Sequence, residues 1–328
     1  CFAIFVLMDY LYLVGGLVLL ILGGDWLLKG AISLSVRINI PKAIIGMTVV
    51  SFATSAPELI VSIKSALQGH ADIALGNVVG SNIANLGFVL GITLLMTKMK
   101  VGRSFVRIDW PILMLVSVLL YACLYFDGEL QFYEGLLFFS LLLVYLVLYL
   151  KFFKNSKIYK EDHVDEEEID EVSDSSSLSV GSTLLFLFIG ALGLYFGSEF
   201  LIEGSVNLAS AYGVSERVIG ITVISVGTSI PELAASIIAA IKKERAISLG
   251  NLIGSNIFNI LAVLGVTSMI TPIRVSDDRL LTNDLFWMLG FAVVLLPLIY
   301  MFTRRELKWK EGLFLLVGYV VFILNTIQ

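Results

Sequence analysis

Two short segments of this 328-residue chain place an acidic side chain inside apolar sequence, and the second segment repeats the first. Residues 46–59 read GMTVVSFATSAPEL and residues 220–233 read GITVISVGTSIPEL, so that each copy holds one glutamate, Glu58 or Glu232. A carboxylate within a membrane-spanning segment is costly and is usually functional. Hydroxyl residues and a proline precede each glutamate, and the pattern predicts a cation site of hard oxygen donors. Such donors suit Ca²⁺ and Na⁺ and suit zinc or copper poorly.

A second pair of matched segments supplies polar side chains without charge. Residues 76–85 read GNVVGSNIAN and residues 250–259 read GNLIGSNIFN, and both pairs of segments are offset by 174 positions. A spacing of four places three polar residues of each copy on one face of a helix. We expect these amides and hydroxyls to complete an oxygen-lined pocket: Asn77, Ser81 and Asn85 from the first copy, and Asn251, Ser255 and Asn259 from the second.

Composition predicts the elements that position these residues. Apolar residues make up 58% of the chain, only 15% of residues are charged and the mean hydropathy is +0.92. Soluble domains carry about 25% charged residues, so this is an all-α, polytopic membrane protein whose apolar stretches have helix length. Ten transmembrane helices are predicted at residues 9–28, 43–68, 72–97, 108–126, 131–153, 181–211, 215–241, 246–271, 281–303 and 310–327.

Prolines interrupt two of the predicted spans beside the glutamates. Pro57 lies in span 43–68 and Pro231 lies in span 215–241, which are the second and the seventh. Proline removes a backbone donor and clashes with the preceding turn, and these two helices should therefore be broken. Carbonyl groups freed at membrane depth are tolerated where they line a cavity, and they could bind a cation there.

The spans form two halves of five. Residues 1–153 make the first repeat, with its motif at 46–85, and residues 181–328 make the second, with its motif at 220–259; an acidic, serine-rich linker occupies 154–180. Five is odd, so the second half enters the membrane inverted, an architecture typical of secondary transporters. Most of the 22 basic residues fall in loops on one side, which predicts both termini outside and a cytoplasmic linker.

With these duplicated motifs the chain resembles the sodium/calcium exchangers of the cation/Ca²⁺ exchanger superfamily, above all their prokaryotic ten-helix branch. The resemblance implies Na⁺/Ca²⁺ antiport by alternating access, normally extruding Ca²⁺. By motif position it implies Ca²⁺ ligands at Thr54, Glu58, Thr228 and Glu232. It further implies Na⁺ ligands or pocket lining at Ser55, Ser81, Asn85, Ser225, Ser229, Ser255 and Asn259, with Ser225 acting through its carbonyl.

Charge and motif content narrow the choice of function. Two carboxylates neutralise one Ca²⁺ or two Na⁺, so the ions would compete at a shared site. Potassium-dependent relatives have aspartate at the position of Asn259, and its neutral amide argues against K⁺ cotransport. A proton/Ca²⁺ exchanger and a passive cation channel remain alternatives. An intramembrane protease would need a frame such as GxGD or HExxH, and the sequence contains neither, so we expect no enzyme and no cofactor beyond the transported ions.

The sequence also supports expectations about the location of the protein, its partners and two further acidic residues. We expect a multi-pass protein of the inner or plasma membrane that contacts lipid, binds no nucleic acid and acts as a monomer. Asp25 and Glu199 fall late in their spans, which indicates helix-end or interface groups. Met8 precedes an apolar run, so it is the expected natural start, with residues 1–7 an upstream extension.

Overall fold

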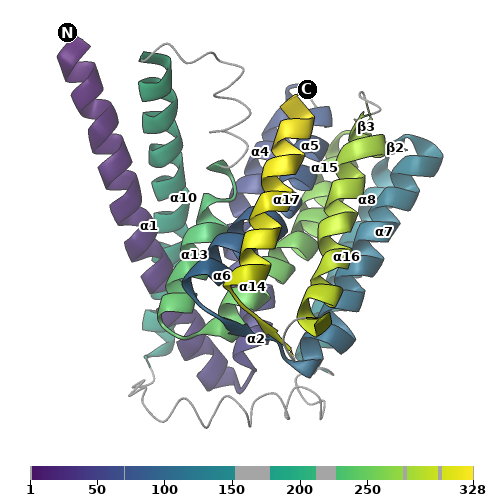
Figure 1. Ribbon diagram of the computed structural model, residues 1–328, viewed down its shortest axis with the longest axis horizontal. Coiled ribbons are helices and arrows are strands. Elements are labelled where there is room, and N and C mark those ends of the chain that lie inside the picture. The colour runs from purple at the N-terminus through teal and green to yellow at the C-terminus, as the bar shows by residue number, and fades with distance from the viewer. Residues whose placement is uncertain are drawn as a thin grey trace.

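The computed structural model is almost entirely helical (Figure 1). It describes residues 2–69, 71–151, 178–211, 227–275, 279–301 and 305–327. Most of the acidic linker, the first half of the seventh predicted span and Ser225 therefore lie outside the described residues.

Helices follow one another along the chain with few strands between them. In the described part of the chain, five short stretches, labelled η, are turns of π-helix next to or inside longer helices. The helical elements are α1 (Phe2–Ile38), α2 (Lys42–Ile45), η1 (Gly46–Val50), α3 (Ser51–Thr54), α4 (Ala56–Leu67), α5 (Ala71–Ala84), η2 (Asn85–Val89), α6 (Leu90–Met96), η3 (Phe105–Asp109), α7 (Trp110–Asp127), α8 (Phe132–Lys151), α10 (Val180–Ala211), α13 (Ile230–Ile241), α14 (Arg245–Phe258), η6 (Asn259–Leu264), α15 (Gly265–Ile270), η7 (Leu280–Asp284), α16 (Leu285–Met301) and α17 (Trp309–Ile327).

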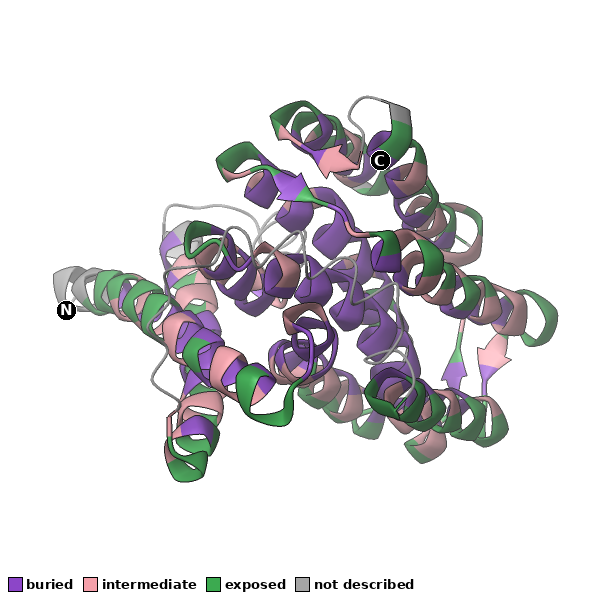
Figure 2. Ribbon diagram, turned by 90° about the horizontal axis from the view of Figure 1, so that it is seen from below, coloured by how far each residue is buried: buried purple, intermediate pink, exposed green. Residues whose placement is uncertain are grey.

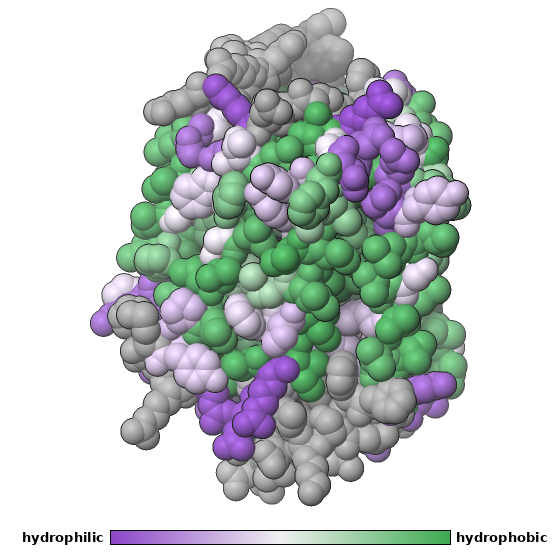
Figure 3. Space-filling view, turned by 90° about the vertical axis from the view of Figure 1, so that its right-hand side faces the viewer, coloured by the Kyte–Doolittle hydropathy of each residue, from purple (hydrophilic) through white to green (hydrophobic). Residues whose placement is uncertain are grey.

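The described helices account for most of the predicted membrane spans. Eight continuous helical stretches are long and apolar enough to cross a membrane, and the pair Lys42–Thr54 and Ala56–Leu67, bent by 41°, makes a ninth. The remaining predicted span, the seventh at 215–241, is represented in the described residues by the shorter apolar helix α13. Figure 3 shows hydrophobic side chains across the middle of the face that it draws, with hydrophilic side chains towards the two ends. The chain is thus a polytopic helical membrane protein.

The first predicted helix break occurs just before its proline. Ser55 interrupts the first of these helices with φ −85° and ψ 2°. In the second copy α13 begins directly after Ser229, which has φ −87° and ψ 4°, and residues 212–226 before it lie outside the described part of the chain. Pro57 and Pro231 then lie in the first turn of α4 and α13. The N–H groups of a first turn make no hydrogen bond within the helix, so a proline there costs none. Helices α4 and α13 therefore each begin with an N-terminus in the interior of the protein.

Two long helical stretches form the centre of the bundle. They are α5–η2–α6 and α14–η6–α15, and they are buried along most of their length, whereas the other spans are mainly exposed at their outer faces (Figure 2). Glycine permits the closest approach: a Cβ on Gly250 would lie 2.5 Å from the carbonyl oxygen of Ala43, and one on Gly254 would lie 2.5 Å from that of Met47. The backbone of α14 thus packs directly on α2 and η1.

Helices α1 and α10 form an antiparallel pair at the edge of the bundle (Figure 1). Their 37 and 32 residues correspond to about 55 and 48 Å of helix. Glycines bring the two backbones together, since a Cβ on Gly16 would lie 2.8 Å from the carbonyl oxygen of Gly197. The two helices pack far more extensively against each other than against the remaining helices.

The predicted first span, 9–28, is too short. Helix α1 continues to Ile38. The charged residues at the end of the apolar run do not end the helix, because they form ion pairs at the surface. Asp25 bonds to Lys29 at 2.8 Å along α1 and also pairs with Lys242, which follows α13. Asp25 is therefore the interface group that the sequence predicted.

Two short ribbons tie the halves of the chain together. Strand β1 (Met99–Lys100) pairs antiparallel with β4 (Glu306–Leu307), and β2 (Glu129–Leu130) pairs antiparallel with β3 (Ile273–Arg274). Strand β3 lies 174 residues after β1, which is the offset between the two repeats. The two ribbons therefore occupy equivalent positions in the two repeats. Figure 1 shows β2 and β3 at the same end of the molecule as both termini. Segments predicted to share a side of the membrane are thus hydrogen-bonded to each other.

Candidate ion-binding site

Two carboxylates occupy equivalent places on the broken helices. Glu58 lies in the first turn of α4 and Glu232 in the first turn of α13, and both side chains are fully buried. A helix N-terminus carries partial positive charge, which favours an ionised carboxylate at this position. Ser55, three residues before Glu58, donates a hydrogen bond to Glu232, so the two carboxylates belong to the same interface. Two carboxylates there would repel each other, and a cation between them would relieve that repulsion.

Several buried oxygen atoms of the two repeated motifs, including those of the carboxylates, have no hydrogen-bond donor within the described part of the chain. They are Oε1 and Oε2 of Glu58, Oε2 of Glu232, Oγ of Ser229, and Oδ1 of Asn85 and Asn259. A buried acceptor without a partner costs about 1–3 kcal/mol, more for a charged group, so such atoms are rare in folded proteins. The set consists of hard oxygen donors, which is the ligand chemistry of Ca²⁺ and Na⁺.

Hydroxyl groups bridge the two repeats in a matched pair of contacts. Thr54 Oγ1 lies 3.2 Å from Ser255 Oγ, and Thr228 Oγ1 lies 3.3 Å from Ser81 Oγ. The second contact is the first one shifted by the repeat, with the halves exchanged. Each broken helix therefore meets the central helix of the opposite half, as an inverted repeat requires.

The carboxylate of the second copy also receives a donor from the first copy. Ser55 Oγ donates to Glu232 Oε1 at 3.4 Å. Thr54 Oγ1 donates to Asn251 Oδ1 at 3.1 Å, next to its contact with Ser255. These residues are buried, so the polar contacts are isolated from water and the interface is held by side chains from both halves.

Four asparagines lie across the interface of the central helices. Asn259 Nδ2 donates to Asn82 Oδ1 at 3.1 Å, and Asn85 Nδ2 donates to Asn256 Oδ1 at 3.4 Å. These contacts use the Nδ2 atoms of Asn85 and Asn259. The Oδ1 atoms of the same two residues have no hydrogen-bond donor among the described residues and can therefore accept one or bind a cation. Asn82 and Asn256 were not among the residues predicted from the sequence, although they belong to the same motifs and repeat with the same 174-residue offset.

Asn77 and Asn251 support the broken helices. Asn77 Nδ2 donates to Ser62 Oγ at 3.1 Å and to the backbone oxygen of Glu58 at 3.4 Å. Asn251 Nδ2 donates to Ser236 Oγ at 3.4 Å, which is the equivalent contact in the second half. These amides fix the positions of α4 and α13 relative to the central helices, and hence the positions of the two carboxylates.

The structure places the sequence-predicted residues at one buried interface. Those found there are Thr54, Ser55, Glu58, Ser81, Asn85, Thr228, Ser229, Glu232, Ser255 and Asn259. Thr228 is partly exposed and the other nine are buried. Among the described residues no group of three or more histidine, cysteine, aspartate or glutamate side chains could hold a metal ion. The site thus combines two negative charges with neutral oxygen atoms.

Comparisons with known proteins agree with this arrangement. A family model described as sodium/calcium exchanger protein matches residues 8–151 and 182–328. CaxA of Alkalimonas amylolytica is 38% identical over 94% of this chain and 96% of its own length, and the sodium/calcium exchanger MaX1 of Methanosarcina acetivorans is 33% identical over 96% and 97%. A solved structure of the sodium-calcium exchanger NCX_Mj superposes with a TM-score of 0.81 at 26% identity, covering 98% of this chain and 99% of that one.

Proposed function

This chain belongs to the sodium/calcium exchanger protein family, and from that premise we propose that it exchanges Na⁺ for Ca²⁺ across the membrane and normally extrudes Ca²⁺. The family consists of transporters of Ca²⁺ and Na⁺, so the protein is a membrane antiporter and not an enzyme. The observation that carries the Na⁺/Ca²⁺ proposal is the set of buried oxygens without hydrogen-bond donors that Glu58 and Glu232 share with Ser229, Asn85 and Asn259. MaX1, described as a sodium/calcium exchanger, is similar along nearly the whole chain and supports Na⁺ as the coupling ion.

In this proposal Ca²⁺ binds between the two broken helices. Its ligands are the carboxylates of Glu58 and Glu232 and oxygen atoms of Thr54 and Thr228. Ca²⁺ takes six to eight oxygen ligands, which two carboxylates with neighbouring hydroxyl and carbonyl oxygens can supply. The two carboxylates balance the charge of one Ca²⁺, which favours a single divalent ion at the centre.

Na⁺ ions bind in the same proposal around this centre and displace Ca²⁺. Their ligands are Ser55, Ser81, Ser229, Ser255 and the carbonyl of Ser225, with Asn85 and Asn259 lining the pocket. Ser81 and Ser255 each touch the threonine of the opposite half, so a Na⁺ ion at either serine would compete for an oxygen of the Ca²⁺ site. Direct competition couples the two ions without a second, distant site.

Alternating access then requires one part of the protein to move against another. The pair α1 and α10 packs mainly on itself, and its contacts with the rest of the described bundle are fewer, chiefly to α2, η1, α3 and α13. We assign the movement to this pair, sliding or rocking over the broken helices. Two buried carboxylates that lack cations are costly in a dry interior, so an empty transporter should resist the change.

The orientation is part of the proposal as well. Both termini face the outside and the linker faces the cytoplasm, in agreement with the predominance of basic residues in the loops on the opposite side from the termini. Strand β1 lies beside Lys98 and Arg103 and pairs with β4, which lies beside Lys308 and Lys310, so this ribbon belongs to the cytoplasmic side.

Ca²⁺ uptake into proteoliposomes tests the coupling. Vesicles loaded with Na⁺ and diluted into Na⁺-free buffer with radioactive Ca²⁺ should accumulate Ca²⁺ above its external concentration, and vesicles with equal Na⁺ on both sides should not. Uptake that ignores the Na⁺ gradient contradicts the proposal. The same vesicles with an imposed pH gradient and no Na⁺ distinguish proton exchange, and a lack of saturable counterflow would identify a channel.

A further inference from the structure

The two halves of the chain differ at one pair of equivalent contacts. The 174-residue offset relates α1 to α10 and α4 to α13, so the contact of α1 with α13 corresponds to a contact of α10 with α4. Helix α1 packs extensively on α13, whereas α10 and α4 make at most marginal contact in the described part of the chain. Such a difference between inverted halves represents one of the two conformations of alternating access, and the opposite conformation would exchange the two contacts.

An ion pair accompanies the contact of α1 with α13. Asp25 of α1 pairs with Lys242, the residue that follows α13, and the backbone at the neighbouring Gly24 lies directly against the Ile238 side chain of α13. Asp25 also bonds to Lys29 at 2.8 Å, but both of these residues belong to α1, so a movement of the helix leaves their bond unchanged. The pair with Lys242, in contrast, joins two elements that the proposed movement displaces relative to each other.

The other half of the sequence lacks a counterpart of this ion pair. The offset relates Asp25 to Glu199 and relates Lys242 to Gln68. Because glutamine is uncharged, a conformation in which α10 packs on α4 could not form an ion pair between these two positions. An interaction that is made in one conformation and not in the other shifts the equilibrium by its own free energy.

Helix α10 follows α1 in such a movement. Asn207 Nδ2 donates to Asp9 Oδ1 at 3.0 Å near one end of the two helices, and the hydroxyl oxygens of Ser33 and Thr183 lie 2.7 Å apart near the other end. Polar contacts thus add to the close glycine packing between the two backbones. A restraint on α1 therefore also restrains α10.

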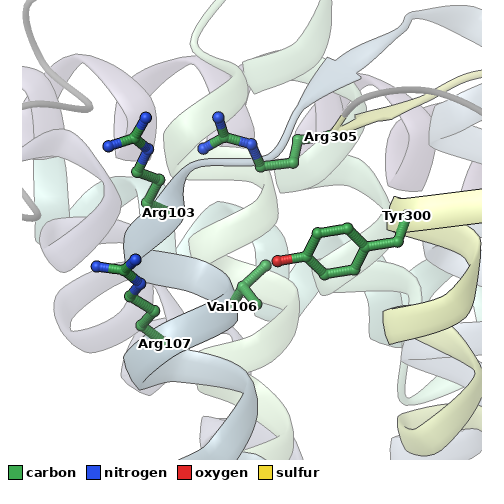
Figure 4. Close-up of a pocket in the computed structure, with 5 residues that line it drawn as sticks. All are labelled: Arg103, Val106, Arg107, Tyr300 and Arg305. Atoms are coloured by element: carbon green, nitrogen blue, oxygen red, sulfur yellow. The ribbon is translucent and has the colours of Figure 1, made fainter.

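The ion pair lies at the end of the molecule that is cytoplasmic in the proposed topology. Helix α14 begins at Arg245, shortly after Lys242, and contacts β1. Arg103 and Arg107 follow β1, Arg305 precedes β4, and Figure 4 shows these three arginines around one cleft. An excess of basic residues is typical of the cytoplasmic side. The conformation is thus closed between α1 and α13 at its cytoplasmic end.

We propose that the Asp25–Lys242 ion pair stabilises this conformation, closed to the cytoplasm, over the opposite one. The proposal rests on the exchange by alternating access proposed above and on the movement of α1 and α10. Partly exposed ion pairs contribute modestly, which corresponds to about a two- to fivefold change in the ratio of the two conformations. The pair therefore makes the two faces of the transporter unequal without blocking transport.

The apparent Ca²⁺ affinity at each face of the membrane tests this role. A rarely populated conformation binds its ligand with an affinity reduced by its fractional population. In inside-out vesicles, Asp25→Asn and Lys242→Gln should each lower the half-saturating Ca²⁺ concentration at the cytoplasmic face by about two- to fivefold. In right-side-out vesicles they should leave the outer value nearly unchanged. Lys242→Arg, which keeps the pair, and Lys243→Gln, which removes the neighbouring exposed charge, should match the wild type.

A distance measurement gives a second readout that needs no transport. With Cys1 and Cys123 replaced by serine, spin labels on Leu11→Cys of α1 and Lys151→Cys at the end of α8 would lie towards opposite ends of the molecule. A sliding of α1 therefore changes the distance between the labels, which electron paramagnetic resonance measures. Asp25→Asn should raise the ratio of the second distance to the first by about two- to fivefold.

The outcomes separate this role from a structural one and from the exchange itself. Unchanged distance populations with unchanged affinities in both Asp25→Asn and Lys242→Gln would overturn the proposal. Equal shifts of affinity at both faces would overturn it as well, because they would indicate a disturbed ion site. A wild type without Na⁺-driven Ca²⁺ uptake would instead overturn the proposed function, while the distance populations would still report whether the ion pair restrains α1.

Discussion

Glu58 and Glu232 are each an acid held at the start of a helix in the interior of the protein. Neither has an arginine, lysine or histidine partner among the described residues, since the ion pairs found there involve other carboxylates. An uncompensated buried charge is strongly destabilising. Protonation of the carboxyls or a bound cation would remove this cost, and the proposed exchange assigns that role to the transported cation.

Replacing either glutamate by glutamine should abolish exchange. Glutamine keeps the shape and removes the charge, so Glu58→Gln and Glu232→Gln should each reduce Na⁺-driven Ca²⁺ uptake by at least about 100-fold, since even indirect ligand partners are worth 10- to 100-fold. The assay is uptake into proteoliposomes at matched protein content. Glu203→Gln, at an exposed carboxylate of α10, is the control and should behave as the wild type. Retained exchange in both site variants would refute the assigned centre.

The amides around this centre illustrate which polar residues a sequence can identify. Asn85 and Asn259 were predicted from their spacing, and the structure places them at the interface with their oxygens unpaired. Asn82 and Asn256 belong to the same repeated motifs and were overlooked, because their role is to hold the amides of Asn259 and Asn85. Such a pairing across two halves cannot be read from spacing within one helix.

Close backbone packing holds the broken helix against the opposite half. At Gly254, a Cβ would meet the Met47 backbone at 2.5 Å, whereas at Gly290 it would meet nothing within 4 Å. Gly254→Ala should therefore lower stability by about 1–3 kcal/mol, the usual cost of overpacking, while Gly290→Ala should be nearly neutral. Thermal unfolding in detergent, followed by tryptophan fluorescence, measures both. A Gly254→Ala protein as stable as Gly290→Ala would show that η1 and α14 are not in direct backbone contact.

The ribbon of β2 and β3 contributes a charge-dependent contact. Arg274 donates to Glu129 at 2.7 Å, and this bond, with a second from Gln131, lowers the pKa of the Glu129 carboxyl below its ordinary value of 4.5. A lowered pKa means that the contact stabilises the fold fully above that ordinary value and is lost as the pH falls through the pKa in the folded state.

The loss should be visible as a pH-dependent difference between two proteins. Glu129→Gln should unfold at a slightly lower temperature than the wild type at neutral pH, and the difference should disappear in acid. Glu129 is partly exposed and its partner Arg274 is mostly exposed, so the difference should also shrink at high salt. A deficit that persists unchanged at acid pH would show that the ion pair is not its cause.

The helical elements were predictable to differing degrees. Pro57 correctly predicted a broken helix, but the break falls at Ser55 because proline is tolerated in a first turn. The equivalent Pro231 lies in the first turn of α13, and the second predicted break stays a prediction because residues 212–226 lie outside the described part of the chain. The π-helical turns that begin at Asn85 and Asn259 left no signal in the hydropathy. They widen the helix locally, a feature often found at functional sites, and depend on packing between the halves.

The molecule as a whole is organised by one repeated set of contacts. Hydroxyl, amide and ribbon pairs all recur with the halves exchanged, and both termini lie at one end (Figure 1). The sequence predicted this inversion from an odd number of spans per half. The sequence did not predict which long helices pack together. The glycines of α1 and α10 allow close backbone contact, but nothing in the sequence shows which helix each of them faces.

Orientation in the membrane gives a prediction for intact cells. In a background with Cys1 and Cys123 replaced by serine, Gln131→Cys beside β2 should react with a membrane-impermeant maleimide from outside, because it lies at the end of the molecule that holds the termini. Lys100→Cys, in the opposite ribbon, should react only after the cells are opened. Labelling in the reverse order would invert the proposed topology and leave the fold unchanged.

The most direct test of the account is to locate the ion. Crystals of the protein soaked with Ca²⁺, and then with Na⁺ instead, would show by anomalous scattering where Ca²⁺ binds. The account predicts one Ca²⁺ peak about 2.3–2.6 Å from carboxylate oxygens of both Glu58 and Glu232, displaced when Na⁺ replaces Ca²⁺. A Ca²⁺ ion bound elsewhere, or held by only one of the two glutamates, would contradict a shared centre between the inverted halves.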